Sequence, residues 1–130
     1  MNDALIGLGS NIRPRKNIFL ALCKLDRCFT IHKRSKFIRT KPIGYLQQPD
    51  FVNGVIEIRT RIRKNELIRI LKSIEKEMGR VRTSNKNGPR VIDLDLLIWN
   101  DQIVDTDVIH RHYLKKLIHE IKPAFQMKQS

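Results

Sequence analysis

Apolar residues recur along the chain at spacings that change between those of strands and those of helices. Short runs rich in Val, Ile, Leu and Phe predict strands over residues 3–8, 29–39, 51–59 and 91–99. Apolar residues three or four positions apart predict helices over residues 16–27 and 65–78, and a shorter helix near 112–121. Asn65 is the expected N-cap of the second helix and Gly79 its terminator. Residues 40–50, with two prolines and a glycine, are expected to form a loop, and Asn100-Asp101 a turn.

The order strand-helix-strand-strand-helix-strand predicts an α+β fold. It matches a ferredoxin-like sandwich, in which a four-stranded antiparallel sheet carries both helices on one face. The other face of the sheet is then expected to be free to carry a site.

The predicted strand over residues 91–99 contains two acidic residues in an otherwise apolar run. Because side chains alternate along a strand, Ile92, Leu94, Leu96 and Ile98 are expected to share one face. Asp93 and Asp95 then lie on the opposite face, roughly 6–7 Å apart. Two such carboxylates either share a proton or share a cation, unless they lie at a solvated edge where both ionise at little cost. Hard oxygen ligands favour Mg²⁺, which also binds substrate phosphates, so the pair points to a nucleotide-phosphate enzyme.

The segment from Gly79 to Arg90 is basic and has no acidic residue. Its arginines, Arg80, Arg82 and Arg90, have the planar geometry that suits phosphate oxygens. A lid that brings positive charge onto a polyphosphate is one interpretation, and a solvated basic loop or a contact with nucleic acid is the other. No Walker-type phosphate loop is present in the sequence.

Composition and charge set the remaining limits. The 130 residues are expected to form one domain, residues 1–130, and the net charge of +13 predicts a surface that attracts anions. Cys23 and Cys28 do not form a disulfide framework, so reduced thiols and a cytoplasmic location are expected. No signal peptide and no membrane span are expected. His110 and His112 lack a third zinc ligand at convincing spacing.

Five motifs resemble one enzyme family in order and spacing. They are GLGSN, RTKPIG, QPDFVNGV, IEKEMGRVR and GPRVIDLDLL. Together they resemble the 6-hydroxymethyl-7,8-dihydropterin pyrophosphokinases over about residues 4–123. The resemblance implies transfer of the β,γ-pyrophosphoryl group of ATP to the hydroxymethyl oxygen of the pterin, release of AMP, and two Mg²⁺ ions.

The resemblance also implies a role for particular residues. Both metal ions would be held by Asp93 and Asp95, and the catalytic set would add Arg80, Arg82 and Arg90. Pterin would lie among Thr40, Pro42, Ile43, Phe51, Asn53 and Tyr113, with the two aromatic rings stacked on it and Asn53 reading its edge. ATP contacts would be Glu75, Arg82, Arg90, Leu96, His110 and Arg111.

This chain departs from the family in three places. Asn87 stands where the lid usually carries a Trp, Lys72 replaces a Gln that contacts ATP, and the segment over residues 105–112 is shortened. A pterin-binding relative with little activity therefore remains an alternative. A basic nucleic-acid-binding module is another, but only Phe51 fits its aromatic pattern and the carboxylates would repel phosphate. The expected partners are ATP and the pterin, with no membrane partner and a monomeric chain.

Overall fold

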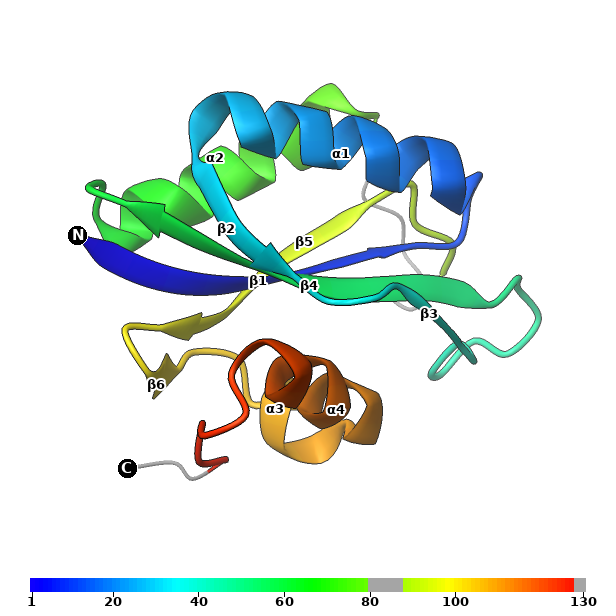
Figure 1. Ribbon diagram of the computed structural model, residues 1–130. Helices are drawn as coiled ribbons and strands as arrows, with labels where there is room; N and C mark the ends of the chain where they lie inside the picture. The colour runs from blue at the N-terminus through cyan, green and yellow to red at the C-terminus, as the bar shows by residue number, and fades with distance from the viewer. Residues whose placement is uncertain (80–87, 128–130) are drawn as a thin grey trace.

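The computed structural model describes residues 1–79 and 88–127. Within these residues one antiparallel sheet has six strands in the order β2-β4-β1-β5-β6, and β3 pairs with β4 (Figure 1). The strands are β1 (Asn2–Ser10), β2 (Thr30–Arg34), β3 (Ile38–Thr40), β4 (Phe51–Thr60), β5 (Asp93–Trp99) and β6 (Gln102–Ile103). The helices are α1 (Pro14–Cys28), α2 (Lys64–Glu77), α3 (Asp107–His110) and α4 (His112–Ile121).

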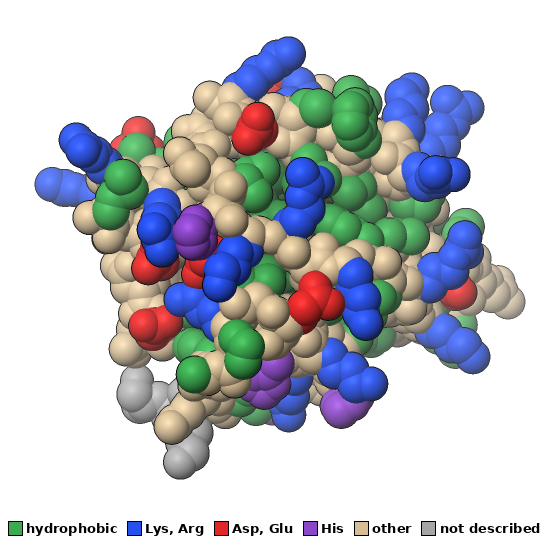
Figure 2. All heavy atoms as spheres, in the orientation of Figure 1, with side chains coloured by type: hydrophobic (Ala, Val, Ile, Leu, Met, Phe, Trp, Pro, Cys, Tyr) green, Lys and Arg blue, Asp and Glu red, His purple; other side chains and the backbone are tan. Residues whose placement is uncertain are grey.

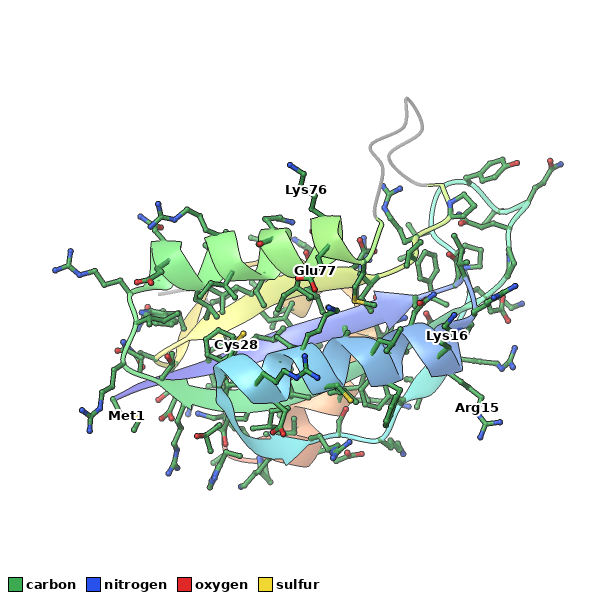
Figure 3. The ribbon with its side chains drawn as sticks, turned by 90° about the horizontal axis from the view of Figure 1, so that it is seen from above. Met1, Arg15, Lys16, Cys28, Lys76 and Glu77 are labelled. Atoms are coloured by element: carbon green, nitrogen blue, oxygen red, sulfur yellow. The ribbon has the colours of Figure 1, made fainter. Side chains whose placement is uncertain are left out.

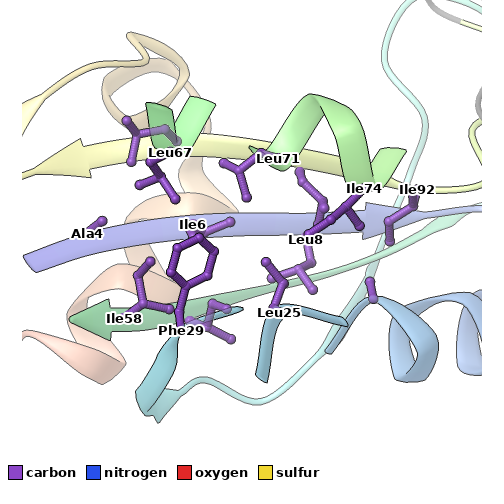
Figure 4. Close-up of a cluster of buried hydrophobic side chains, with 14 of the residues drawn as sticks. Ala4, Ile6, Leu8, Leu25, Phe29, Ile58, Leu67, Leu71, Ile74 and Ile92 are labelled. Carbon is purple, nitrogen blue, oxygen red and sulfur yellow. The ribbon is translucent and has the colours of Figure 1, made fainter. Parts of the chain in front are cut away.

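Helices α1 and α2 cover one face of the sheet and lie side by side on it (Figures 1 and 3). Ile18, Ala21 and Leu25 form the buried stripe of α1, which begins at Pro14, where a missing N–H costs nothing. The stripe of α2 ends in Ile74 and Glu75. The apolar side chains of both stripes pack with alternate residues of β1 and β5 and with Phe29 in one buried cluster (Figure 4).

Helices α3 and α4 cover part of the opposite face, so the expectation of a free face holds only for the part that they leave uncovered. Leu117 and Ile118 of α4 are buried with Leu5, Val55 and other apolar residues of the sheet in a second core. Lys122, just after α4, lies 3.3 Å from the buried carboxylate of Glu57 on β4, measured from Nζ to Oε2. The uncovered remainder of this face is where a cleft forms.

The expected count of four strands is wrong, whereas the short helix predicted near 112–121 is confirmed as α4 and α3 is additional. The predicted strand over residues 29–39 divides into β2 and β3, because one extra residue lies between the pairs Arg34–Ile56 and Ile38–Asn53. Asn100 and Asp101 both have positive φ, as a tight hairpin turn requires, and lead into the additional strand β6. Asn65 is not the N-cap of α2, since the helix begins at Lys64 after Arg63. Gly79 ends that helical segment with a φ of 91°, as expected.

A bulge in β5 changes which residues share a face. Leu5 pairs with Ile98 and the next residue, Ile6, pairs with Leu96, so Leu97 is an extra residue. Leu94 and Leu96 face the helices α1 and α2, as predicted, but Ile98 packs in the second core on the other face. The prediction that Ile98 shares the face of Leu94 is therefore wrong.

Basic side chains are spread over the molecular surface. Lys and Arg are scattered across the face seen in Figure 2, with fewer Asp and Glu between them. No helix among the described residues is long and apolar enough to cross a membrane.

Candidate active site

A cleft of about 260 Å³ opens on the face of the sheet that α3 and α4 only partly cover. It is bounded by the ends of β1, β4 and β5, by the loop after β3, and by the start of α4. Its lining residues include Gly7, Leu8, Gly9, Thr40, Ile43, Phe51, Asn53, Arg90, Asp93, Asp95, Leu97, Arg111 and Tyr113. We call this the first cleft.

Asp93 and Asp95 project into the first cleft from β5. In the antiparallel ladder Gly9 pairs with Asp93 and Gly7 pairs with Asp95. Because neither glycine has a side chain, Leu97 packs closely against Gly7 and the amide of Asn53 against Gly9. The predicted pairing of these acids on one face of the strand is confirmed.

Asp95 carries an electrostatically costly charge. The pKa of Asp95 is raised to about 6. The larger cause is the loss of water around the carboxylate, and the second is the negative charge of Asp93. Lys72 acts in the opposite direction and lowers it. Asp95 is nevertheless exposed to solvent. A solvated cation can therefore reach it and would relieve the repulsion.

Arg90 lies beside the acid pair. Its Nε is 3.7 Å from Oδ1 of Asp93, and only 11% of its side chain is exposed. A buried guanidinium held next to a carboxylate is restricted in orientation, so its remaining donors have a defined direction. Arg90 thus places positive charge in the first cleft next to the negative pair.

The opposite wall of the first cleft carries the residues expected to bind pterin. Nδ2 of Asn53 donates to Oγ1 of Thr40 at 2.6 Å, which fixes the side-chain amide of Asn53. Phe51 lies two residues before Asn53 on the same face of β4, and Tyr113 enters from α4. Nη1 of Arg111 donates to the hydroxyl of Tyr113 at 3.4 Å. Two aromatic rings and a fixed amide in one cleft are side chains that can hold a flat, hydrogen-bonding ring.

Gly9 is required for the fixed position of Asn53. A Cβ atom at residue 9 would lie 2.5 Å from Oδ1 of Asn53, which is too close. Gly9→Ala should rotate the amide away from Thr40 and weaken pterin binding about tenfold, the size of one hydrogen bond. Titration of the intrinsic pterin fluorescence measures this. Gly7→Ala is the control, because the nearest atoms to its Cβ would be those of the Leu97 side chain, at 3.2 Å, and not the amide of Asn53. Equal affinities of the two variants would contradict the prediction.

A second cleft, of about 330 Å³, lies on the other side of Asp95. Apolar residues of α2 and β5, including Leu71 and Leu96, line it together with Lys72, Asp105 and Thr106. Asp95 and Asp105 line both clefts. A ligand in the second cleft would therefore meet a ligand in the first cleft at Asp95.

Some predicted site residues lie elsewhere. Pro42 is buried and does not line the first cleft, and His110 is exposed and lines neither cleft. Glu75 is 2% exposed, and its Oε2 accepts from the backbone N–H of Leu94 at 2.7 Å. Arg80 and Arg82, and with them Asn87, lie outside the described residues.

Two acids of the first cleft, Asp105 and Asp107, were not predicted from the sequence. Oδ1 of Asp105 accepts from the N–H of Asp107 at 2.9 Å, and Asp107 forms an ion pair of 3.3 Å with Arg111. The signal was a second Asp-x-Asp sequence after the hairpin. Its place in the cleft depends on the path of the chain from β6 into α3, which no local pattern reveals.

The donor set at Asp93 and Asp95 fits a divalent cation of the Mg²⁺ type. It offers two carboxylates on an accessible surface, and Mg²⁺ commonly fills its other positions with water and substrate phosphate. Among residues 1–79 and 88–127, no group of three or more His, Cys, Asp or Glu side chains is arranged to hold a metal by itself. The zinc interpretation of His110 and His112 gains no support from that part of the chain.

Comparison with known proteins gives the same relationship as the motifs. Residues 5–123 match the family model for 7,8-dihydro-6-hydroxymethylpterin-pyrophosphokinase. The chain is 38% identical over 109 residues to the 2-amino-4-hydroxy-6-hydroxymethyldihydropteridine pyrophosphokinase of Bacillus subtilis, covering 82% of this chain and 65% of that protein. It is 36% identical over 110 residues to the enzyme of the same name from Aquifex aeolicus, covering 84% and 68%.

A longer relative matches through a part of its length. The folate synthesis bifunctional protein of Arabidopsis thaliana is 36% identical over 107 residues, which cover 81% of this chain and 22% of that protein. The chain thus spans about two thirds, or less, of the curated relatives described here. The match to the family model covers most of the chain, so the chain belongs to the 7,8-dihydro-6-hydroxymethylpterin-pyrophosphokinase family.

Proposed function

We propose that this chain transfers the β,γ-pyrophosphoryl group of ATP to the hydroxymethyl oxygen of 6-hydroxymethyl-7,8-dihydropterin, as one step of folate synthesis. A new bond forms between that oxygen and the β-phosphorus while the hydroxyl proton passes to water, the bond from the β-phosphorus to the α,β-bridging oxygen breaks, and AMP leaves. The observation that carries the proposal is the position of Asp95, which borders both clefts and faces Asp93 in the first.

The first cleft is the proposed pterin site. Phe51 and Tyr113 would stack on the ring, while Asn53, held by Thr40, would hydrogen-bond its edge. Ile43, which is half exposed, would cover the open side. Pro42 is buried next to Ile43 and would act by shaping this loop.

The second cleft is the proposed site of the nucleoside of ATP. Ile68 and Val104, which are partly exposed, offer apolar surface to a base above the buried Leu71 and Leu96, and Lys72 offers a cation. Arg111, at the start of α4, and the exposed His110 are further proposed ATP contacts. Glu75 would act indirectly, because it holds the backbone of β5 at Leu94, next to Asp95.

Asp93 and Asp95 would hold two Mg²⁺ ions. Bound there, the ions would supply charge neutralisation of the triphosphate and alignment of the attacking oxygen. Arg90, with Arg80 and Arg82, would stabilise the charge of the migrating group. Positioning and electrostatics would dominate over acid-base catalysis, as is usual in phosphoryl transfer. The βαββαβ part of the sheet and its first two helices would form a ferredoxin-like unit in a monomeric enzyme of one domain.

The direct test is the release of AMP from ATP. The proposal expects AMP that depends on both hydroxymethyldihydropterin and Mg²⁺. Release of ADP would contradict it. Pterin binding without turnover would favour the alternative of an inactive relative.

The charge on Asp95 also makes stability depend on pH and on metal. Its pKa of about 6 in the folded state exceeds the ordinary value of 3.8, so stability that is present below pH 4 is lost as the pH rises to 6. In EDTA, Asp95→Asn should therefore melt at a higher temperature than the wild type above pH 6, and the difference should vanish near pH 4. Added Mg²⁺ should raise the melting temperature of the wild type more than that of the variant. A pH-independent difference would contradict the assignment.

A further inference from the structure

Asn11 is a buried polar residue at the edge of the candidate site. It follows Ser10, the last residue of β1, and only 3% of its surface is exposed. It lines neither the first nor the second cleft, so it would not touch the pterin or the nucleoside of ATP directly. A buried amide must have its hydrogen-bonding groups satisfied, and the partners of Asn11 show what it does.

Asn11 bridges two segments that are far apart in the sequence. Its Nδ2 donates to Oε1 of Gln48 at 2.7 Å and to the carbonyl oxygen of Pro49 at 3.0 Å. Its Oδ1 accepts from the backbone N–H of Arg90 at 2.8 Å, and its own N–H donates to the carbonyl oxygen of Arg90 at 3.1 Å. The Nδ2 group of Asn11 therefore donates only to residues 48 and 49, and its Oδ1 accepts from residue 90.

Only an amide of this length meets these requirements. Aspartate has the same shape, but it has no donor and would direct an oxygen at two acceptors, Gln48 Oε1 and the carbonyl of Pro49. Alanine would leave the N–H of Arg90 without its acceptor. The orientation of the amide follows from the donors and acceptors around it.

The two bridged segments carry opposite sides of the first cleft. Gln48 and Pro49 end the loop that leads into Phe51 and Asn53 on β4. Arg90 leads into Asp93 on β5, and its guanidinium lies beside that carboxylate. The position of Arg90 and Asp93 relative to Phe51 and Asn53 therefore depends on the hydrogen bonds of Asn11.

We infer that Asn11 is a positioning residue, which holds Arg90 and the loop over residues 41–50 at the separation that transfer between the two substrates requires. This inference rests on the proposed function. Displacement of one side by about 1 Å can cost about a hundredfold in rate without loss of folding.

The test compares Asn11→Asp and Asn11→Ala with Asn17→Ala. Asn17 is the matched control, since its Nδ2 donates to the carbonyl of Ile12 near the same end of β1 but bridges no site segment. Both Asn11 variants should lose about ten- to a hundredfold in kcat, with a smaller change in KM for ATP. Asn17→Ala should keep wild-type kinetics even where its melting temperature falls.

A double variant separates positioning from general loss of stability. If Asn11 acts through Arg90, Asn11→Ala should cost much less in kcat when it is added to Arg90→Ala than when it is added to the wild type. Fully additive losses, or wild-type kcat in Asn11→Asp, would overturn the inference. If the Asn11 variants do not fold, Gln48→Leu tests the loop side alone, and a wild-type kcat there would equally overturn it.

Failure of the proposed function is distinguishable from failure of this inference. A wild-type protein that forms no AMP contradicts the function itself. Hydrogen exchange then decides the inference, because Asn11→Ala should expose the amide of Arg90 to faster exchange while Asn17→Ala should not. Unchanged exchange at Arg90 would overturn it.

Discussion

Asp95→Asn is expected to reduce kcat by at least about a thousandfold, or about 4 kcal/mol in the activation barrier. The substitution keeps the shape of the side chain and removes the charge that faces both clefts. An amide is a weaker ligand for Mg²⁺ than a carboxylate, so the triphosphate would lose both its counterion and its alignment. The measurement is AMP release at saturating ATP, pterin and Mg²⁺.

Asp107→Asn is the matched control for that variant. Asp107 lines the same cleft and carries the same charge, but it is paired with Arg111 at 3.3 Å. We expect a loss of less than about tenfold, because removing a partly exposed ion pair changes little. Equal losses in both variants would mean that the general negative charge of the cleft matters and that Asp95 has no special role.

Leu117→Ala is expected to destabilise the protein by about 3 kcal/mol. Leu117 is 1% exposed and lies in the core between α4 and the sheet, in one cluster with Leu5, Val55 and Leu97 of the sheet. Truncation leaves a cavity that the sheet cannot close, since its strands are fixed by their neighbours on both sides. Urea denaturation with linear extrapolation measures the change.

The same variant tests whether α4 holds the site together. Arg111 and Tyr113 lie at the start of this helix, so loosening its core should also raise KM for the pterin. Lys116→Ala, on the exposed side of α4, should change the free energy of unfolding by less than about 0.5 kcal/mol. A stable Leu117→Ala protein with unchanged KM would contradict the structural role of α4.

The parts of the fold that sequence predicts well are those with a clear period. One such feature is the apolar stripe of α2, which packs in the core. Another is the alternation along β4, which places Asn53 on one face and Ile56 on the other. The Asp93–Asp95 pair was recognisable because two like charges in an apolar strand need a physical reason. These features depend only on neighbours along the chain.

The parts that sequence did not predict depend on contacts between distant residues. Ser35 interrupts the strand over 29–39, because its Oγ accepts from the N–H of Val55 at 2.9 Å and its own N–H donates to the carbonyl of Val55. The apolar side of the helix over 112–121 was visible, but its docking under the sheet was not. Asp105 and Asp107 reach the site only through that docking.

The bulge at Leu97 divides β5 into two halves that are out of phase with each other. The half with Asp93 and Asp95 presents alternate residues to the cleft, and the half with Leu97 and Ile98 presents consecutive residues to the core under α4. One continuous strand thus lines the first cleft with one half and packs against α4 with the other. Because Leu97 lines the first cleft and also packs in the core between α4 and the sheet, a substitution there would alter the wall of the cleft and the anchoring of the C-terminal helix together.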